Sequence, residues 1–165
     1  MVLVNNFEVL DMAVNLERNG ISFYSKAAQQ AADPSLAKLL SGLVEMERAH
    51  ERTFSELRAH LSPEQRQIEL ADKEGVSAAY IDSLLHGQVV FDPGFDAQSW
   101  LEAHPTPAEM LRKAVGFEKD TVMFYMSIRE LMLPVQASTA KIDTIIAEEK
   151  RHVVLLAGQL RRYVS

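Results

Sequence analysis

The chain has 165 residues, of which 47% are hydrophobic and 24% are charged, with 17 Lys and Arg against 23 Asp and Glu and a net charge of -6. These proportions are typical of one soluble globular domain, which we expect to span residues 1–165. The acidic balance, without a block of basic residues, argues against nucleic acid as a partner because phosphate binding needs clustered cations. The absence of cysteine excludes disulfides, thiolate metal sites and thiol nucleophiles.

No stretch of the sequence approaches the roughly 18 consecutive apolar residues that a membrane-spanning helix needs. Residues 1–11 also lack the basic start and the apolar run of a signal peptide. We therefore expect a cytoplasmic protein with no membrane partner.

Apolar residues recur three and four positions apart through most of the chain, which predicts an all-α fold with four long helices. Two of the expected starts, Asp33-Pro34 and Thr106-Pro107, place a capping residue before a proline, as is common at helix N-termini. Glu109 is also spaced for a capping box with Thr106. The expected spans are 6–31, 34–61, 107–133 and 136–163.

About 45 residues, 62–106, separate the second and third helices. Within them, residues 76–86 are amphipathic and Gly87 can end a short helix, while Asp92-Pro93-Gly94 predicts a turn. The short links after the first and third helices predict two antiparallel hairpins, which the long segment joins as a crossover. This is the topology of a ferritin-like four-helix bundle.

An internal repeat supports this topology. The first and third helices match at an offset of 101 positions, and the second and fourth match at an offset of 102. A duplicated helical hairpin, folded about a pseudo-twofold axis, explains both offsets. The matched pairs include Leu10 with Leu111, Val14 with Val115, Glu17 with Glu118, Tyr24 with Tyr125, Leu43 with Ile145, Glu47 with Glu149, and His50 with His152.

The repeat places one carboxylate inside each apolar stripe of the first and third helices, at Glu17 and Glu118. A buried carboxylate requires a cation, a hydrogen-bond network or a raised pKa. The second and fourth helices each carry Glu-x-x-His, as Glu47 with His50 and Glu149 with His152, a spacing that puts both side chains on one face.

A single Glu-x-x-His motif is weak evidence for a metal site. The evidence here is that both motifs fall at equivalent positions of the repeat, each matched by a core glutamate on the preceding helix. Four carboxylates and two imidazoles converging in a bundle core are the ligand set of di-iron carboxylate proteins. Glu148 competes with Glu149 as a ligand, but only Glu149 keeps the spacing of the first motif. The alternatives are exposed glutamates beside the core stripe and core histidines bound to backbone carbonyls.

Across all four helices the sequence resembles the rubrerythrin-like branch of the ferritin-like superfamily. The residues that carry the resemblance are 17–24, 47–50, 118–125 and 147–152. It implies Glu17 and Glu118 as terminal metal ligands, Glu47 and Glu149 as bridges between two metals, and one histidine, His50 or His152, on each metal. It also implies that Tyr24 and Tyr125 lie next to the ligand carboxylates.

The sequence departs from full-length rubrerythrins in two ways. They carry a four-cysteine rubredoxin domain that passes electrons to the di-iron site, so this cysteine-free chain is expected to use an external electron donor. Their third helix also holds an extra glutamate, whereas the position three beyond Glu118 is Thr121 and the neighbouring Asp120 belongs to another face. The predicted site is therefore the symmetric kind, with four glutamates and two histidines.

The leading functional prediction is a non-haem di-iron oxidoreductase that binds two iron ions and reduces hydrogen peroxide or oxygen while Fe(II) is oxidised. Zinc or manganese could occupy the same ligands. The alternatives are non-catalytic iron storage, delivery or sensing at the same site, hydroxylation of an organic substrate, and a bundle with a purely structural polar network.

The remaining histidines, His60, His86 and His104, lack a glutamate three positions earlier and are expected to be solvated. We expect a homodimer, with the apolar residues of the crossover as its candidate surface. The alternative is that these residues cover the chain's own bundle. They are Tyr80, Ile81, Leu84, Leu85, Val89, Val90, Phe91, Phe95 and Trp100.

Overall fold

The computed structural model describes residues 5–67, 97–103, 105–131 and 136–164. Within these ranges the chain forms helices and no strand, which confirms the predicted all-α class. The four long helices are α1 (Asn6–Gln30), α2 (Pro34–Ala59), α6 (Pro107–Leu131) and α7 (Gln136–Leu160). The short ones are α3 (Pro63–Arg66), α5 (Ala97–Glu102) and the 3-10 helix η1 (Arg161–Tyr163).

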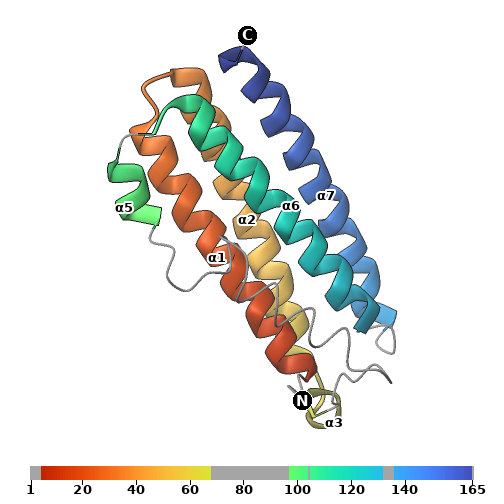
Figure 1. Ribbon diagram of the computed structural model, residues 1–165. Helices are drawn as coiled ribbons and strands as arrows, with labels where there is room; N and C mark the ends of the chain where they lie inside the picture. The colour runs from red at the N-terminus through yellow and green to blue at the C-terminus, as the bar shows by residue number, and fades with distance from the viewer. Residues whose placement is uncertain (1–4, 68–96, 104, 132–135, 165) are drawn as a thin grey trace.

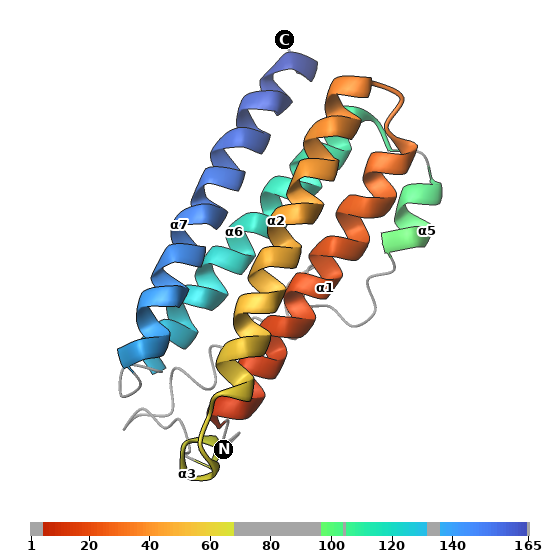
Figure 2. The same cartoon turned by 180° about the vertical axis from the view of Figure 1, so that it is seen from behind.

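The long helices form two antiparallel hairpins, α1 with α2 and α6 with α7 (Figures 1 and 2). Helices α2 and α6 run in the same direction, so α6 begins at the end of the bundle opposite to the one where α2 ends (Figure 1). The two termini consequently lie at opposite ends. This is the predicted arrangement of two hairpins joined by one long connection.

Polar caps fix where the helices begin. Asn5 and Glu8 form a reciprocal capping box at the start of α1, with hydrogen bonds of 2.9 and 3.0 Å. At α6 the Thr106 N–H donates to Glu109 Oε2 at 2.7 Å, and the Glu109 N–H donates to Thr106 Oγ1 at 3.3 Å. The box predicted at Thr106 therefore forms, because it satisfies N–H groups that have no partner inside the helix.

Three helix ends differ from the predicted ones, and the end predicted at 133 lies outside the described residues. Helix α1 ends at Gln30, one residue before the predicted end. Helix α2 ends at Ala59 rather than at residue 61, because Ser62 adopts an extended conformation that caps α3 and that Pro63 favours. The fourth helix was expected to reach residue 163, but its last three residues tighten into η1. Such tightening satisfies terminal carbonyls through shorter-range bonds.

Two apolar clusters fill the bundle, one toward each end, and every long helix contributes to both. In α1 the first cluster includes residues up to Leu16 and the second starts at Phe23, and the order is reversed in α2. Between the clusters, at the middle of the bundle, lies a band of buried polar side chains. Its charged or ionisable members are Glu17, Glu47, His50, Glu118, Glu149 and His152.

Several predictions fall on the crossover. The short helix expected over 76–86 lies outside the described residues, as do His86, His104 and the apolar residues of the candidate dimer surface other than Trp100. Trp100 is half-buried and lies 6.2 Å from Phe23 between ring centroids, so it covers the chain's own bundle. His60 is exposed, with Nδ1 2.7 Å from the Glu56 carbonyl oxygen.

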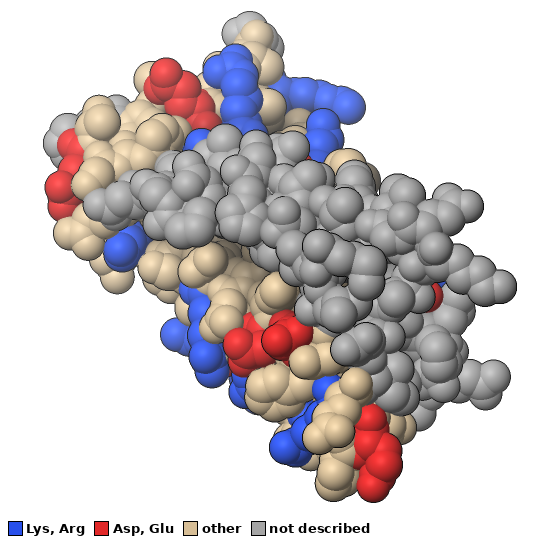
Figure 3. Space-filling model, turned by 60° about the horizontal axis from the view of Figure 1, so that its bottom comes forward, with Lys and Arg blue, Asp and Glu red and all other residues tan. Residues whose placement is uncertain are grey.

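The exposed surface carries charges of both signs. On the face shown in Figure 3, the acidic and basic side chains of the described residues are interspersed. None of the described helices combines the length and the apolar character that crossing a membrane requires.

Candidate metal centre

All six residues predicted as ligands meet at the middle of the bundle. Their exposed fractions range from 0% for Glu149 to 4% for Glu47. Each comes from the helix and face that the repeat predicts: α1 and α6 supply one glutamate each, and α2 and α7 supply one Glu-x-x-His pair each. Tertiary packing therefore brings together side chains that lie up to 135 positions apart, from Glu17 to His152.

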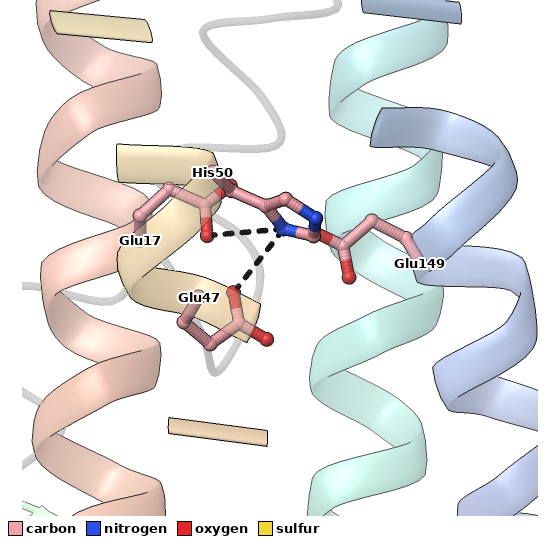
Figure 4. Close-up of side chains that lie close together, drawn as sticks. All are labelled: Glu17, Glu47, His50 and Glu149. Carbon is pink, nitrogen blue, oxygen red and sulfur yellow. Dashed lines mark ion pairs between the residues drawn. The ribbon is translucent and has the colours of Figure 1, made fainter. Parts of the chain in front are cut away.

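One group of ligand atoms surrounds the inner ring nitrogen of His50 (Figure 4). His50 Nδ1 lies 2.9 Å from Glu149 Oε1 and 3.8 Å from both Glu17 Oε2 and Glu47 Oε2. Figure 4 shows these carboxylates approaching from three helices.

A second group surrounds the inner ring nitrogen of His152. His152 Nδ1 lies 2.9 Å from Glu149 Oε2, 3.4 Å from Glu118 Oε2 and 3.6 Å from Glu47 Oε1. The two imidazole rings are stacked, with centroids 5.7 Å apart. The two groups are therefore adjacent and similarly built.

Glu47 and Glu149 belong to both groups, and in each group the four ligand atoms lie within 4.8 Å of one another. Glu149 directs Oε1 toward His50 and Oε2 toward His152, and Glu47 divides its two oxygens in the same way. A carboxylate shared between two sites through its two oxygens is suited to bridging a pair of cations.

The buried polar atoms fit a cation. Among the described residues, Glu17 Oε2, Glu149 Oε1 and His50 Nδ1 are buried without a hydrogen-bond partner. The 2.9 Å contact of His50 with Glu149 satisfies an ion-pair distance but lacks the direction of a hydrogen bond. Buried polar atoms without partners are costly. Four carboxylates also match the charge of two divalent ions.

Without metal, protons compensate part of this charge. Burial, together with the nearby carboxylate of Glu47, raises the pKa of Glu17 well above its ordinary value of 4.5. Burial also raises the pKa of Glu118, although its ion pair with His152 opposes the shift. These two carboxylates therefore favour the neutral form.

The histidines favour the charged form. Burial alone would lower their pKa values, but the negative carboxylates around them outweigh it: Glu149 and Glu47 raise the pKa of His50 to about 11, and Glu118 and Glu149 raise that of His152 to about 10. Burial would likewise raise the pKa of Glu149, yet its hydrogen bond with His152 and its ion pair with His50 lower it to about 2. Glu149 thus stays ionised between two imidazolium rings.

Two tyrosines link the hairpins at this level. The Tyr24 hydroxyl of α1 donates to Glu118 of α6, and the Tyr125 hydroxyl of α6 donates to Glu17 of α1. Burial raises the pKa of both hydroxyls, and the neighbouring carboxylates raise it further. Each predicted tyrosine thus lies beside a predicted terminal ligand, but one from the opposite hairpin.

Two further contacts were not predicted from the sequence. Glu148, considered only as a rival ligand, lies 2.9 Å from His50 through its Oε2 and the outer ring nitrogen Nε2. Met46 places its sulfur 3.0 Å from His152 Nε2. The signal available in the sequence was that each residue directly precedes a Glu-x-x-His motif.

The position of the extra rubrerythrin glutamate is occupied here by small side chains. Thr121, three residues beyond Glu118, is buried, and its counterpart in the first hairpin is Gly20. A Cβ atom at Gly20 would lie 3.5 Å from Cγ and Cδ of Glu47, in ordinary contact. Asp120 is half-buried, and burial raises its pKa. Among the described residues, the groups that could hold a metal ion contain only the four glutamates and two histidines.

Comparisons with known proteins agree with this arrangement. Residues 8–87, which include the first hairpin with Glu17, Glu47 and His50, match the rubrerythrin family. No curated protein matches the chain in sequence. A solved structure from Thermotoga maritima, provisionally described as a ferritin-like diiron-carboxylate protein, superposes with a TM-score of 0.77.

That alignment covers 98% of this chain and 97% of the Thermotoga maritima chain, at 21% sequence identity. At this identity the likeness establishes the shared fold alone, over the full length of both proteins. The sequence match to rubrerythrin covers the first hairpin, and the internal repeat relates the second hairpin to the first. The chain is therefore rubrerythrin-like, with a ferritin-like fold and a buried carboxylate and histidine cluster suited to two metal ions.

Proposed function

We propose that the protein is a non-haem di-iron oxidoreductase that reduces hydrogen peroxide or oxygen while Fe(II) is oxidised. The observation that supports this function is the pair of four-residue groups that share Glu47 and Glu149. In this proposal Glu17 and Glu118 are terminal ligands, Glu47 and Glu149 bridge the ions, and each ion takes one histidine, His50 or His152.

The ligand chemistry favours iron. Carboxylates are hard ligands that suit both the ferrous and the ferric state, and one imidazole on each ion favours a transition metal over magnesium or calcium. Zinc and manganese are possible substitutes in the same site. When bound, an iron pair supplies the two electrons that convert one peroxide and two protons into two waters, with each ion passing from the ferrous to the ferric state.

The chain's own residues would then bind the ions, restrict water and hold protons. The Tyr24 and Tyr125 hydroxyls hold the outer oxygens of Glu118 and Glu17 by hydrogen bonds. The apolar clusters on both sides of the polar band limit access along the bundle axis.

A pocket of about 370 Å³ between α2 and α7 gives a small molecule a route to the outer edges of both histidines. It is lined by Glu45, Met46, Ala49, His50, Glu148, Arg151 and His152. Because the sequence contains no cysteine to hold a thiolate-ligated iron centre, we propose that an external donor supplies the electrons that return the iron to the ferrous state.

The direct test is anaerobic loading with two ferrous ions per chain, followed by stopped-flow mixing with peroxide and, separately, with oxygen. Faster oxidation by peroxide would support a peroxidase, and faster oxidation by oxygen would support an oxidase or ferroxidase. If the chain fails to bind two irons, the proposal is wrong.

The oligomer distinguishes this function from iron storage. We propose a cytoplasmic homodimer, whereas storage requires a closed cage around a mineral. Light scattering of the iron-loaded protein should give the mass of a dimer. A large shell that retains many irons per chain would instead favour storage.

A further inference from the structure

The outer nitrogens of the two candidate ligand histidines have different partners. Both rings turn Nδ1 toward the carboxylate cluster and Nε2 toward the pocket between α2 and α7. His50 Nε2 meets a carboxylate, Glu148 Oε2, at 2.9 Å. His152 Nε2 meets a thioether, Met46 Sδ, at 3.0 Å.

These two partners are equivalent positions of the repeat. Met46 directly precedes Glu47, Glu148 directly precedes Glu149, and the two residues lie 102 positions apart, as do His50 and His152. The contacts also cross in the same way, since α7 provides the partner for the histidine of α2 and α2 provides the partner for the histidine of α7. One geometric position therefore carries two different chemical groups.

The difference matters for a metal ligand. A carboxylate accepts a charge-assisted hydrogen bond from an imidazole N–H, which fixes the ring and the tautomer, leaves the other nitrogen free to bind a cation and makes that nitrogen more basic. A thioether sulfur is only a weak acceptor. The His50 ring is therefore held and polarised more strongly than the His152 ring.

We propose that Glu148 is a positioning residue for His50 and that it makes the two metal positions inequivalent, so that a divalent cation prefers the position formed by Glu17 and His50 over the position formed by Glu118 and His152. This inference rests on the proposed di-metal site. It adds that the near-symmetric cluster has a preferred first position, set by a residue that binds no metal itself.

The positions of the two partner residues make the inference testable without disturbing the fold. The Glu148 side chain is 41% exposed and Met46 is 40% exposed. Neither belongs to the buried apolar clusters. Substitution at either position therefore changes the partner of a histidine while the core packing stays intact.

The experiment follows each histidine separately by NMR of the zinc-bound protein. Zinc is diamagnetic, and the Nε2–H signals of His50 and His152 report which position is filled when one zinc ion per chain has been added. The variants are Glu148→Gln, which removes the charge, and the double exchange Met46→Glu with Glu148→Met, which swaps the two partners. Glu45→Gln is the control, because it removes a carboxylate from the same pocket without touching either ring.

In the wild type we expect the His50 position to fill first, with a preference of about tenfold, the lower end of the effect of such outer partners on metal affinity. Glu148→Gln should reduce the preference because its amide oxygen accepts without the charge, the double exchange should reverse it in favour of His152, and Glu45→Gln should leave it unchanged. The His50 Nε2–H signal should also move upfield in Glu148→Gln.

Equal filling of the two positions in the wild type, or an unchanged preference in the double exchange, would overturn the inference while leaving the di-metal site in place. Failure of the wild type to bind any zinc or iron would overturn the proposed function as well. The two failures are therefore distinguishable.

Discussion

Glu17 shows how the properties of a single residue follow from its position in the bundle. Its side chain is 1% exposed, it accepts a hydrogen bond from Tyr125, and its other oxygen lies 3.8 Å from His50 without a hydrogen-bond partner. A helical glutamate with these surroundings is destabilising to the metal-free fold when ionised. The same surroundings suit a cation, so Glu17 lowers the stability of the metal-free fold and favours the binding of a cation.

Glu17→Gln should make the metal-free protein more stable at neutral pH. The pKa of Glu17 is raised by burial above its ordinary value of 4.5, so the unfolded chain releases this proton at lower pH than the folded chain, and stability falls as the pH rises above that ordinary value. Glutamine cannot ionise and removes this loss. Urea unfolding should show a higher midpoint than wild type at pH 7 and a smaller difference near pH 4.

Glu130→Gln, at an exposed carboxylate on α6, is the control and should show no such pH-dependent gain. If the urea midpoint of Glu17→Gln at pH 7 is below that of wild type, burial of the Glu17 carboxylate does not destabilise the metal-free fold and the prediction is wrong. With zinc added the order should reverse, because the variant has lost a ligand.

Metal binding should weaken as the pH falls. The carboxylates of Glu149 and its neighbours raise the pKa of His50 to about 11 and that of His152 to about 10, so both rings carry protons that a metal must displace. For each proton displaced, zinc affinity should drop about tenfold per pH unit. Calorimetry should be run between roughly pH 6.5 and 8, so that zinc stays soluble, in buffers of different ionisation enthalpy. It measures both the zinc affinity and the number of protons that binding releases. An affinity that does not change over this range would be incompatible with the prediction.

At the scale of the element, each long helix carries either one buried glutamate or one Glu-x-x-His pair near its middle, with an apolar segment on each side. The order of these segments reverses between the helices of a hairpin, so the antiparallel pairing brings like segments to the same level. Helix register therefore decides whether the six polar side chains meet. Register depends in turn on where each helix begins, which makes the capping residues part of how the site is assembled.

Thr106→Ala should destabilise the protein by about 1 kcal/mol, a typical cost of losing an N-cap side chain. Thr106 Oγ1 accepts the Glu109 N–H at 3.3 Å, and alanine leaves that donor at the start of α6 without its partner. Thr106→Ser keeps the hydroxyl and should stay close to wild type. Chemical denaturation of the three metal-free proteins measures the difference, and equal stabilities of the alanine and serine variants would show that the cap contributes nothing.

At the scale of the whole molecule, each candidate metal-binding group contains residues from both hairpins. Glu149 of α7 joins Glu17, Glu47 and His50 of the first hairpin, and Glu47 of α2 joins Glu118, Glu149 and His152 of the second. Metal binding would therefore connect the two halves of the bundle. The tyrosine contacts between α1 and α6 cross the same boundary.

Zinc should stabilise the folded protein, by about 2.7 kcal/mol when the free ion is at one hundred times its dissociation constant. Glu149→Gln should weaken the binding of both zinc ions, because this carboxylate belongs to both groups. Glu118→Gln should leave one zinc ion bound near His50. Stoichiometry by calorimetry, together with thermal unfolding, separates the two variants. If both lose a single ion, Glu149 does not bridge.

Much of this protein follows from its sequence alone. The helical period, the caps at Asp33 and Thr106, and the short links determine two hairpins, because these signals act within a few residues of one another. The fixed repeat offset identifies Glu149 rather than Glu148 as the counterpart of Glu47, and the structure places Glu149 inside both candidate metal-binding groups. The spacing of three residues puts each glutamate on the same helix face as its histidine.

Other features were decided only by the tertiary structure. Tyr24 contacts Glu118 and Glu148 contacts His50, and these pairs lie 94 and 98 positions apart. Such contacts depend on how far each helix is rotated and shifted against its neighbours, which local spacing does not specify. The sequence thus determined which groups enter the core, and packing between the hairpins decided which of them touch.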